Sequence, residues 1–285
     1  MARAAAGIVG IGALAAGAGL ALRLRDARDD ARLRDRLAAL TASAPAPRFD
    51  PAMADDLPEP ARRFFRFAVA PGTPLRTAAR IDIGGHLGLG SKGDPRYRRM
   101  RATQVLAPPH GFVWTVRLAG AVPVGGTDAL GPDQSWSRFR VGGLLPVGRA
   151  GGPDHQRSSF GRMVGEALFW APAAFLPEAR GGWDALAWRA LGPDAAEVAV
   201  RANGLEQSAT IVVDPAGRPL RVAFARWSDE NDARAWRSQP FGGELARPRS
   251  FGGWRLPTRV EGGNHFGTPG YWPFFRAEVR AVTFA

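Results

Sequence analysis

The chain has 285 residues, of which 45% are hydrophobic and 22% charged, the balance of a folded globular protein rather than a disordered one. It contains no cysteine, which excludes disulfides, thiolate metal sites, cysteine nucleophiles and lipid attachment through an N-terminal cysteine. The formal net charge of +12 comes almost entirely from arginine, and it reflects either a coding bias or a surface that favours anionic lipid head groups. No nucleic-acid partner is expected, because the arginines are scattered and no reading helix or RNA-binding signature accompanies them.

The first segment is an uncharged stretch of nineteen residues from Ala4 to Leu22, built from Ala, Gly, Ile, Val and Leu. That is about the length of helix that spans a hydrocarbon core. We therefore expect residues 1–22 to be a single-pass transmembrane helix that anchors the chain in a membrane. Two alternatives stay open. The Ala-Gly-Ala run at 16–18 resembles a signal-peptidase site, and the stretch is also compatible with a buried helix of a soluble protein.

The next segment, residues 23–40, has leucines at helical spacing, with Asp and Arg three or four positions apart. We expect a solvated helical stalk here, followed at 41–56 by a Pro/Ala linker. Between Arg23 and Arg36 there are six arginines and four aspartates, and the positive-inside rule would keep this flank in the cytoplasm.

Residues 57–285 are expected to form one β-rich domain. It opens with a short helix at 57–69, after which apolar and polar residues alternate with the period of two that is typical of β-strands. Short turns rich in Gly, Pro and Asp separate the runs, and such short connections require antiparallel pairing. We therefore predict an α+β fold, in which a large curved antiparallel sheet of about nine to eleven strands forms a half-barrel covered by one or two helices.

One convincing helix interrupts the strands at residues 158–176, SSFGRMVGEALFWAPAAFL. Ser158 is the expected N-cap, and Pro172 is expected to end or kink the helix. The broad apolar face of this segment predicts that it lies across the concave face of the sheet. Arg162 and Glu166 are four residues apart on it, so they project from the same side.

This charged pair is the strongest candidate for a functional site. It is either an intrahelical ion pair, worth a few tenths of a kcal/mol, or a polar pair at the mouth of an apolar cavity that orients a ligand head group. Glu166 in an apolar setting is also a candidate acid with a raised pKa, although no second catalytic group accompanies it. The candidate ligand-binding residues are Arg162, Glu166, Trp114, Trp136, Trp170 and Arg226.

Other motifs give no clear catalytic chemistry. Residues 88–93, GLGSKG, match a dinucleotide-binding pattern, but a strand follows where a helix is required, so we interpret them as a hairpin turn. The four histidines are too far apart in sequence to form a local metal pair, and a GxSxG nucleophile motif is missing. We therefore predict no metal site and no cofactor, while a Ser-His-Asp set assembled from distant positions stays open.

Several segments, in a fixed order, resemble an uncharacterised bacterial membrane-anchored family of unknown function. They run from about residue 57 to 284 and read LPEPARRFFRFAV, APPHGFVWTVRL, GRMVGEALFWAPAAFLP, VVDPAGRPLRV, GWRLPTRVEGGNHF and YWPFFRAEV. The R-x-x-x-E…P helix of that family falls on Arg162, Glu166 and Pro172, and its terminal Y/F-W strand falls on Tyr271 and Trp272.

More distantly, the order of strands and helix resembles the half-barrel lipoprotein carriers of the bacterial envelope. The resemblance implies an extracytoplasmic domain, against the arginine count, and this chain lacks the attachment cysteine that many carriers have. We expect a membrane-tethered binding protein that holds a lipid or other apolar ligand in a cavity between the sheet and helix 158–176. The alternatives are an enzyme that acts on an apolar substrate through Glu166, and a scaffold protein of the envelope.

Overall fold

The computed structural model describes residues 2–41, 46–179 and 181–285, with side chains from residue 17 onward. Its strands are β1 (Ala79–Gly88), β2 (Tyr97–Ala107), β3 (Gly111–Leu118), β4 (Val124–Leu130), β5 (Ser135–Val141), β6 (Leu145–Gly151), β7 (Ala185–Ala190), β8 (Ala195–Ala202), β9 (Leu205–Val213), β10 (Pro219–Ser228), β11 (Arg237–Phe251), β12 (Trp254–Asn264) and β13 (Trp272–Phe284). The helices are α1 (Ala2–Thr41), α2 (Glu59–Ala68) and α3 (Pro153–Trp170), with short 3-10 turns at Pro51–Ala54, Pro172–Phe175 and Pro177–Ala179.

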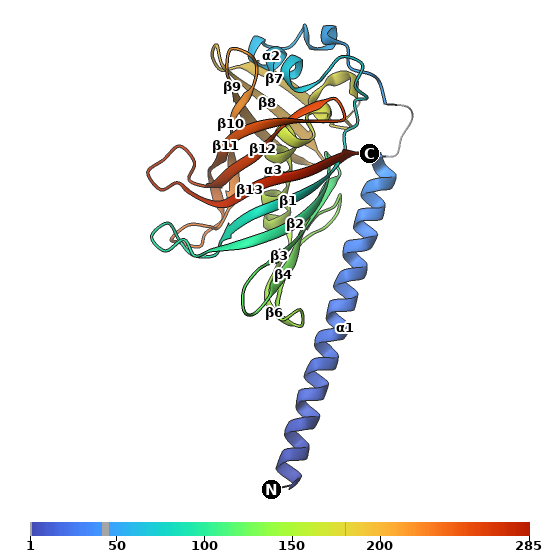
Figure 1. The fold of residues 1–285 in the computed structure, drawn as a ribbon, viewed down its shortest axis with the longest axis vertical. Helices are drawn as coiled ribbons and strands as arrows, with labels where there is room; N and C mark the ends of the chain where they lie inside the picture. The colour runs from blue at the N-terminus through green and yellow to red at the C-terminus, as the bar shows by residue number, and fades with distance from the viewer. Residues whose placement is uncertain (1, 42–45, 180) are drawn as a thin grey trace.

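All of these strands belong to one curved sheet in the order β6-β5-β4-β3-β2-β1-β13-β12-β11-β10-β9-β8-β7, and each pair is antiparallel (Figure 1). The predicted α+β class and antiparallel pairing are confirmed, but the predicted number of strands was too low. The pairing of β1 with β13 joins the two halves of the sheet at its centre. The glycine-rich stretch at 88–93 lies in the β1–β2 hairpin connection, as expected.

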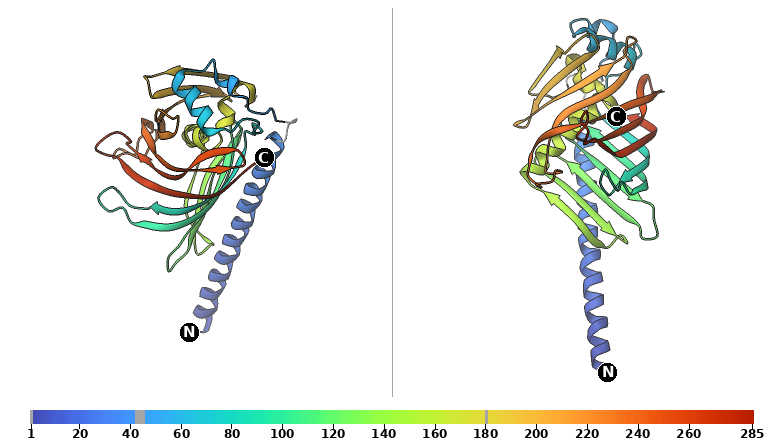
Figure 2. Two further views of the ribbon diagram at one scale, coloured as in Figure 1. Left: turned by 45° about the horizontal axis from the view of Figure 1, so that its top comes forward. Right: turned by 90° about the vertical axis from the view of Figure 1, so that its left-hand side faces the viewer.

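Helix α3 connects β6, at one edge of the sheet, to β7, at the other edge, and so crosses the concave face (Figure 2). It begins at Pro153, earlier than predicted, because a proline fits the first helical turn, where no backbone N–H is needed. Ser158 therefore does not cap the helix but lies buried inside it. The helix ends at Trp170, shortly before Pro172, as the steric restriction before a proline requires.

The concave side of the sheet holds the main hydrophobic core. On most strands, every second side chain points to this side and packs against α2 and α3. The largest fully buried side chains of this core include Phe64, Phe65, Phe112, Trp170, Phe175 and Trp254. Side chains therefore occupy much of the space between the sheet and α3 in which a ligand cavity was expected.

Helix α1 packs on the opposite, outer face of the sheet. Leu33 and Leu37 are buried in a second cluster with outer-face residues of the first strands. Asp26 and Asp30 are also buried, although a solvated stalk was predicted for this segment. The sequence pattern was misread because the buried side of the helix carries aspartates as well as leucines, and the aspartates bind partners on the sheet.

The aspartates of α1 are held by side chains of β4, β5 and β6. Asp30 accepts hydrogen bonds from Trp136 Nε1 (2.9 Å) and Thr127 Oγ1 (3.2 Å). Asp26 forms ion pairs with Arg138, Arg140 and Arg149. These contacts attach the second half of α1 to the sheet.

In the part of the chain that the structure describes, no helix combines the length and apolarity needed to cross a bilayer. The side chains of the expected anchor up to residue 16 lie outside the described residues. The anchor at 1–22, and the boundaries at 22 and 56, stay predictions.

Candidate functional site

The predicted pair on α3 belongs to a cluster of charged and polar side chains that links the helix to the sheet. Arg162 Nε donates to Glu166 Oε1 (2.7 Å), and Arg162 Nη1 donates to Asp128 Oδ2 (2.5 Å) on β4. Gln104 on β2 donates through Nε2 to Glu166 Oε2 (2.6 Å). Both oxygens of Glu166 are therefore engaged, which favours a role in holding α3 in place over a role as a catalytic acid.

Opposite charges stabilise one another in this cluster. Burial tends to raise the pKa of Asp128, but a hydrogen bond from His155 and the charge of Arg162 outweigh it and lower that pKa. Burial opposes the charge of Arg162, yet Glu166 and Asp128 raise its pKa overall. Burial and the neighbouring Arg162 lower the pKa of Arg226 to about 10, so this group is still a cation at neutral pH. Two cations thus balance two carboxylates.

The structure also brings together a serine, a histidine and an aspartate that are far apart in sequence. His155, in the first turns of α3, has Nδ1 2.9 Å from Ser135 Oγ on β5 and Nε2 3.4 Å from Asp128 Oδ1. A serine hydroxyl beside an imidazole is part of a nucleophilic constellation. These contacts link α3 to β5 through Ser135 and to β4 through Asp128, whose other oxygen binds Arg162.

The other predicted site residues lie in three different places. The Arg162 guanidinium lies 5.1 Å from the ring centroid of Trp114, and Arg226 is near this cluster, with Nε 3.2 Å from Ser158 Oγ. Trp170 is fully buried and donates to the carbonyl of Pro257 (3.3 Å). The placement of Trp136 beside these residues was wrong.

Trp136 lies on the outer face of the sheet, where its indole donates to Asp30. Alternation along β5 places Trp136 and Ser137 on opposite faces of the sheet, but it does not reveal which of the two faces covers the main core.

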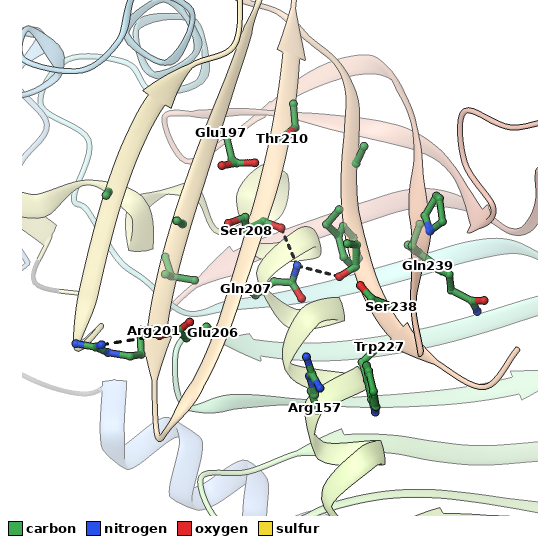
Figure 3. A pocket seen from close by; sticks show the side chains of 18 of the residues that line it. Arg157, Glu197, Arg201, Glu206, Gln207, Ser208, Thr210, Trp227, Ser238 and Gln239 are labelled. Atoms are coloured by element: carbon green, nitrogen blue, oxygen red, sulfur yellow. Dashed lines mark hydrogen bonds and ion pairs between the residues drawn. The ribbon is translucent and has the colours of Figure 1, made fainter. Parts of the chain in front are cut away.

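A cavity of about 920 Å³ lies elsewhere, over strands β7 to β11 (Figure 3). We refer to it as the strand cleft. None of the six predicted site residues lines it. Its walls are formed by Arg157, Ala185, Leu186, Ala187, Glu197, Ala199, Val200, Arg201, Glu206, Gln207, Ser208, Thr210, Ala223, Phe224, Ala225, Trp227, Ser238, Gln239, Pro240, Phe241 and Phe266.

The strand cleft lies where the sheet opens between β9 and β10. Their ladder ends at the pair Thr210–Ala223, and beyond it each strand pairs only with its other neighbour. Gln207 bridges the opening, because its Nε2 donates to the carbonyls of Ser208 (2.7 Å) and Ala225 (3.2 Å). A side-chain amide thus replaces ladder hydrogen bonds that the two backbones no longer make.

Helix α3 runs directly behind this opening (Figure 3). A Cβ atom at Gly161 would lie 2.7 Å from Gln207 Oε1, and one at Gly165 would overlap the ring of Phe224. The two glycines therefore allow α3 to approach β9 and β10 more closely than any larger residue would.

The lining of the strand cleft combines apolar and charged groups. Many of its residues occupy strand positions whose side chains point away from the main core, and several of these residues are alanines. At one end, the Arg157 guanidinium lies 4.0 Å from the ring centroid of Trp227, whose indole donates to Asp154 (2.7 Å). At another, Arg201 and Glu206 form an exposed ion pair at 3.8 Å. Such a lining suits a ligand with an apolar body and a charged end.

Sequence reasoning missed the strand cleft because its position depends on where a ladder ends, which is a non-local property. The sequence did contain one signal. Alanines occupy positions of β8 and β10 whose side chains face solvent, where longer polar residues are usual. Ala199 and Ala225 are examples.

A family model matches residues 47–277, and its family is described as a family of unknown function, DUF6544. The chain belongs to DUF6544. The matched range includes both the charged cluster on α3 and the strand cleft, and it begins after α1. Comparison with curated proteins finds no match.

Two solved structures resemble this DUF6544 protein. One is a LolA superfamily protein from Nitrosomonas europaea, with 10% identity, a TM-score of 0.39, and coverage of 73% of this chain and 84% of that one. The other is a domain from Vibrio parahaemolyticus named for outer membrane lipoprotein sorting, with 11% identity, a TM-score of 0.37, and coverage of 81% of this chain and 93% of that one.

Proposed function

We propose that this DUF6544 protein binds an amphipathic molecule in the strand cleft. The observation that carries the proposal is the cleft itself, a cavity of about 920 Å³ at a place where two neighbouring strands stop pairing. That volume lies within the range of small-molecule sites. The proposal keeps the expected class of ligand, a lipid or similar apolar molecule, but moves the site to the other face of the sheet.

The chemistry of the walls orients the ligand. An acyl chain would lie along the alanines of β7, β8 and β10. The charged end would lie near Arg157, which projects from α3 beside Trp227. An anionic head group is favoured because an arginine offers several N–H donors in a fixed geometry.

The proposal also includes a tether. The uncharged stretch from Ala4 to Leu22 would hold the protein at a membrane, with the domain outside the cytoplasm. Membrane attachment would place the strand cleft close to a source of amphipathic molecules.

A substitution that fills the strand cleft tests the binding site. In Ala225→Trp, the large side chain occupies the space beside the β9–β10 opening, and we expect affinity for a dansyl-labelled fatty acid to fall about tenfold or more. Ala190→Trp is the matched control, because Ala190 is an exposed alanine of β7 outside the cleft. Fluorescence titration of the full chain gives both affinities. Equal affinities for the two variants would refute the assignment of the site.

The head-group assignment has its own test. Arg157→Met should weaken binding of palmitate and leave binding of an uncharged monoacylglycerol nearly unchanged, because only the anion loses a charge-assisted hydrogen bond. An equal loss for both ligands would place the head group away from Arg157.

A further inference from the structure

Large apolar side chains are exposed together at one end of the domain. They lie in the β3–β4 turn, in the β5–β6 hairpin and on α1, and they are Leu20, Leu24, Val122, Leu144, Leu145 and Val147. The most exposed is Leu145, at 63%. Single exposed apolar residues are ordinary, but a contiguous group marks an interaction surface. We call this group the hairpin tip surface.

One hydrogen bond and two close approaches at glycines show that these residues are neighbours. Gly142 N donates to the carbonyl of Pro123 (2.9 Å), which joins the β5–β6 turn to the β3–β4 turn. A Cβ atom at Gly19 of α1 would lie 3.4 Å from the Leu144 carbonyl oxygen, and one at Gly143 would lie 3.2 Å from Arg23 Nη1. The two hairpins thus extend alongside α1, toward its N-terminal half (Figure 1).

Three arginines lie close to the hairpin tip surface. Arg98 donates to the carbonyls of Ala119 (2.8 Å) and Val122 (3.0 Å), so its charge is fixed beside the β3–β4 turn. Arg117, at the end of β3, and Arg23 on α1 are exposed nearby. Exposed apolar side chains with cations beside them are the pattern of a surface that enters the head-group layer of an anionic membrane.

We propose that the hairpin tip surface inserts into the interface of a membrane that contains anionic lipids. The uncharged stretch at 4–22 leaves the domain at this same end, along α1, so a membrane reached by that stretch would face these turns. The insertion adds the β3–β4 and β5–β6 turns to α1 as contacts that orient the domain above the bilayer. The inference is independent of ligand binding in the strand cleft.

The absence of cysteine makes a direct test simple, because any introduced cysteine is the sole labelling site. A nitrobenzoxadiazole probe is attached to full-length Leu145→Cys and Val122→Cys, and the proteins are reconstituted with vesicles of phosphatidylglycerol or of phosphatidylcholine. The matched control is Leu191→Cys, which lies in the β7–β8 turn and is 44% exposed.

On phosphatidylglycerol we expect a blue shift of emission at 122 and 145, with quenching by nitroxide-labelled lipid, and neither effect at 191. The shift should be smaller on phosphatidylcholine, because the arginines then lack anionic partners. In anionic vesicles, Leu145→Asp should reduce the quenching of the Val122→Cys probe by nitroxide-labelled lipid about tenfold.

Two results would overturn the proposal. Probes at 122 and 145 that report water in vesicle-bound protein would show that the hairpin tip surface stays out of the interface. Equal shifts at 122, 145 and 191 would show adsorption without a preferred orientation. Ala225→Trp, which blocks the strand cleft, should leave the emission of all three probes unchanged, so a failure here is distinguishable from a failure of the proposed ligand site.

Discussion

Replacement of Arg162 by methionine tests the role of the charged cluster on α3. The substitution keeps much of the aliphatic volume and removes the cation that contacts both Asp128 and Glu166. Breaking a buried ion pair by removing one partner costs about 3–5 kcal/mol, since the remaining charge is left uncompensated. The side chains of Arg162, Asp128 and Glu166 retain 12%, 15% and 16% exposure, so water compensates in part and we expect about 3 kcal/mol.

Urea denaturation of the full chain measures this loss. With an m-value of about 3 kcal/mol/M, the midpoint should fall by about 1 M at pH 7. The matched control is Arg189→Met, whose pair with Glu197 is 2.7 Å long but leaves Arg189 67% exposed, and which should cost well under 1 kcal/mol.

The contribution of Arg162 to stability should depend on pH. Because Arg162 helps to lower the folded-state pKa of Asp128, its contribution is present above the unfolded pKa and is lost as the pH falls through the folded one. The difference between wild type and Arg162→Met should therefore shrink below about pH 4. A midpoint for Arg162→Met that matches Arg189→Met at pH 7 would refute the stabilising role of the cluster.

Three further substitutions probe how helices α3 and α1 pack on the sheet. Gly165→Ala should lower the urea midpoint, because overlap of the new methyl group with the Phe224 ring costs about 1–3 kcal/mol, more than the gain of up to about 1 kcal/mol in helix propensity. Gly161→Ala should lower the midpoint less, because the new methyl group meets only the movable end of the Gln207 side chain. Equal midpoints for the two variants would contradict the close approach of α3 to β10. Burial raises the pKa of Asp30 above its usual value, despite hydrogen bonds from Trp136 and Thr127. The folded protein therefore binds this proton more tightly than the unfolded chain does, and the free energy of unfolding decreases as the pH rises through the folded-state pKa. Asp30→Asn should accordingly raise the midpoint at pH 7 and equal wild type near pH 3, and a lower midpoint at pH 7 would show that the carboxylate charge is needed.

Local patterns in the sequence predicted the strands well, because alternation and turn residues are local properties. Phe112, Trp114 and Val116 face the core as their spacing required. The Arg162–Glu166 pair was also found from spacing alone, but its partners Asp128 and Gln104 come from strands that only the register of the sheet brings beside α3.

The remaining features depend on where distant segments meet. The burial of Asp26 and Asp30 could not be read from α1, because the groups that satisfy them lie on strands far along the chain. The strand cleft depends on the end of the β9–β10 ladder, where Gln207 takes the place of backbone partners. A glutamine in an otherwise regular strand pattern carries no sign of that role.

The pairing of β1 with β13 has a consequence for biosynthesis. Ala79 lies opposite Phe284, so β1 acquires its second neighbour in the sheet only after β13 has left the ribosome. Until then the nascent protein presents an unsatisfied edge at what will be the middle of its sheet, and such edges invite intermolecular pairing. A protein built in this way depends on protection of that edge during translation, and truncations that remove β13 should aggregate rather than yield a smaller folded domain.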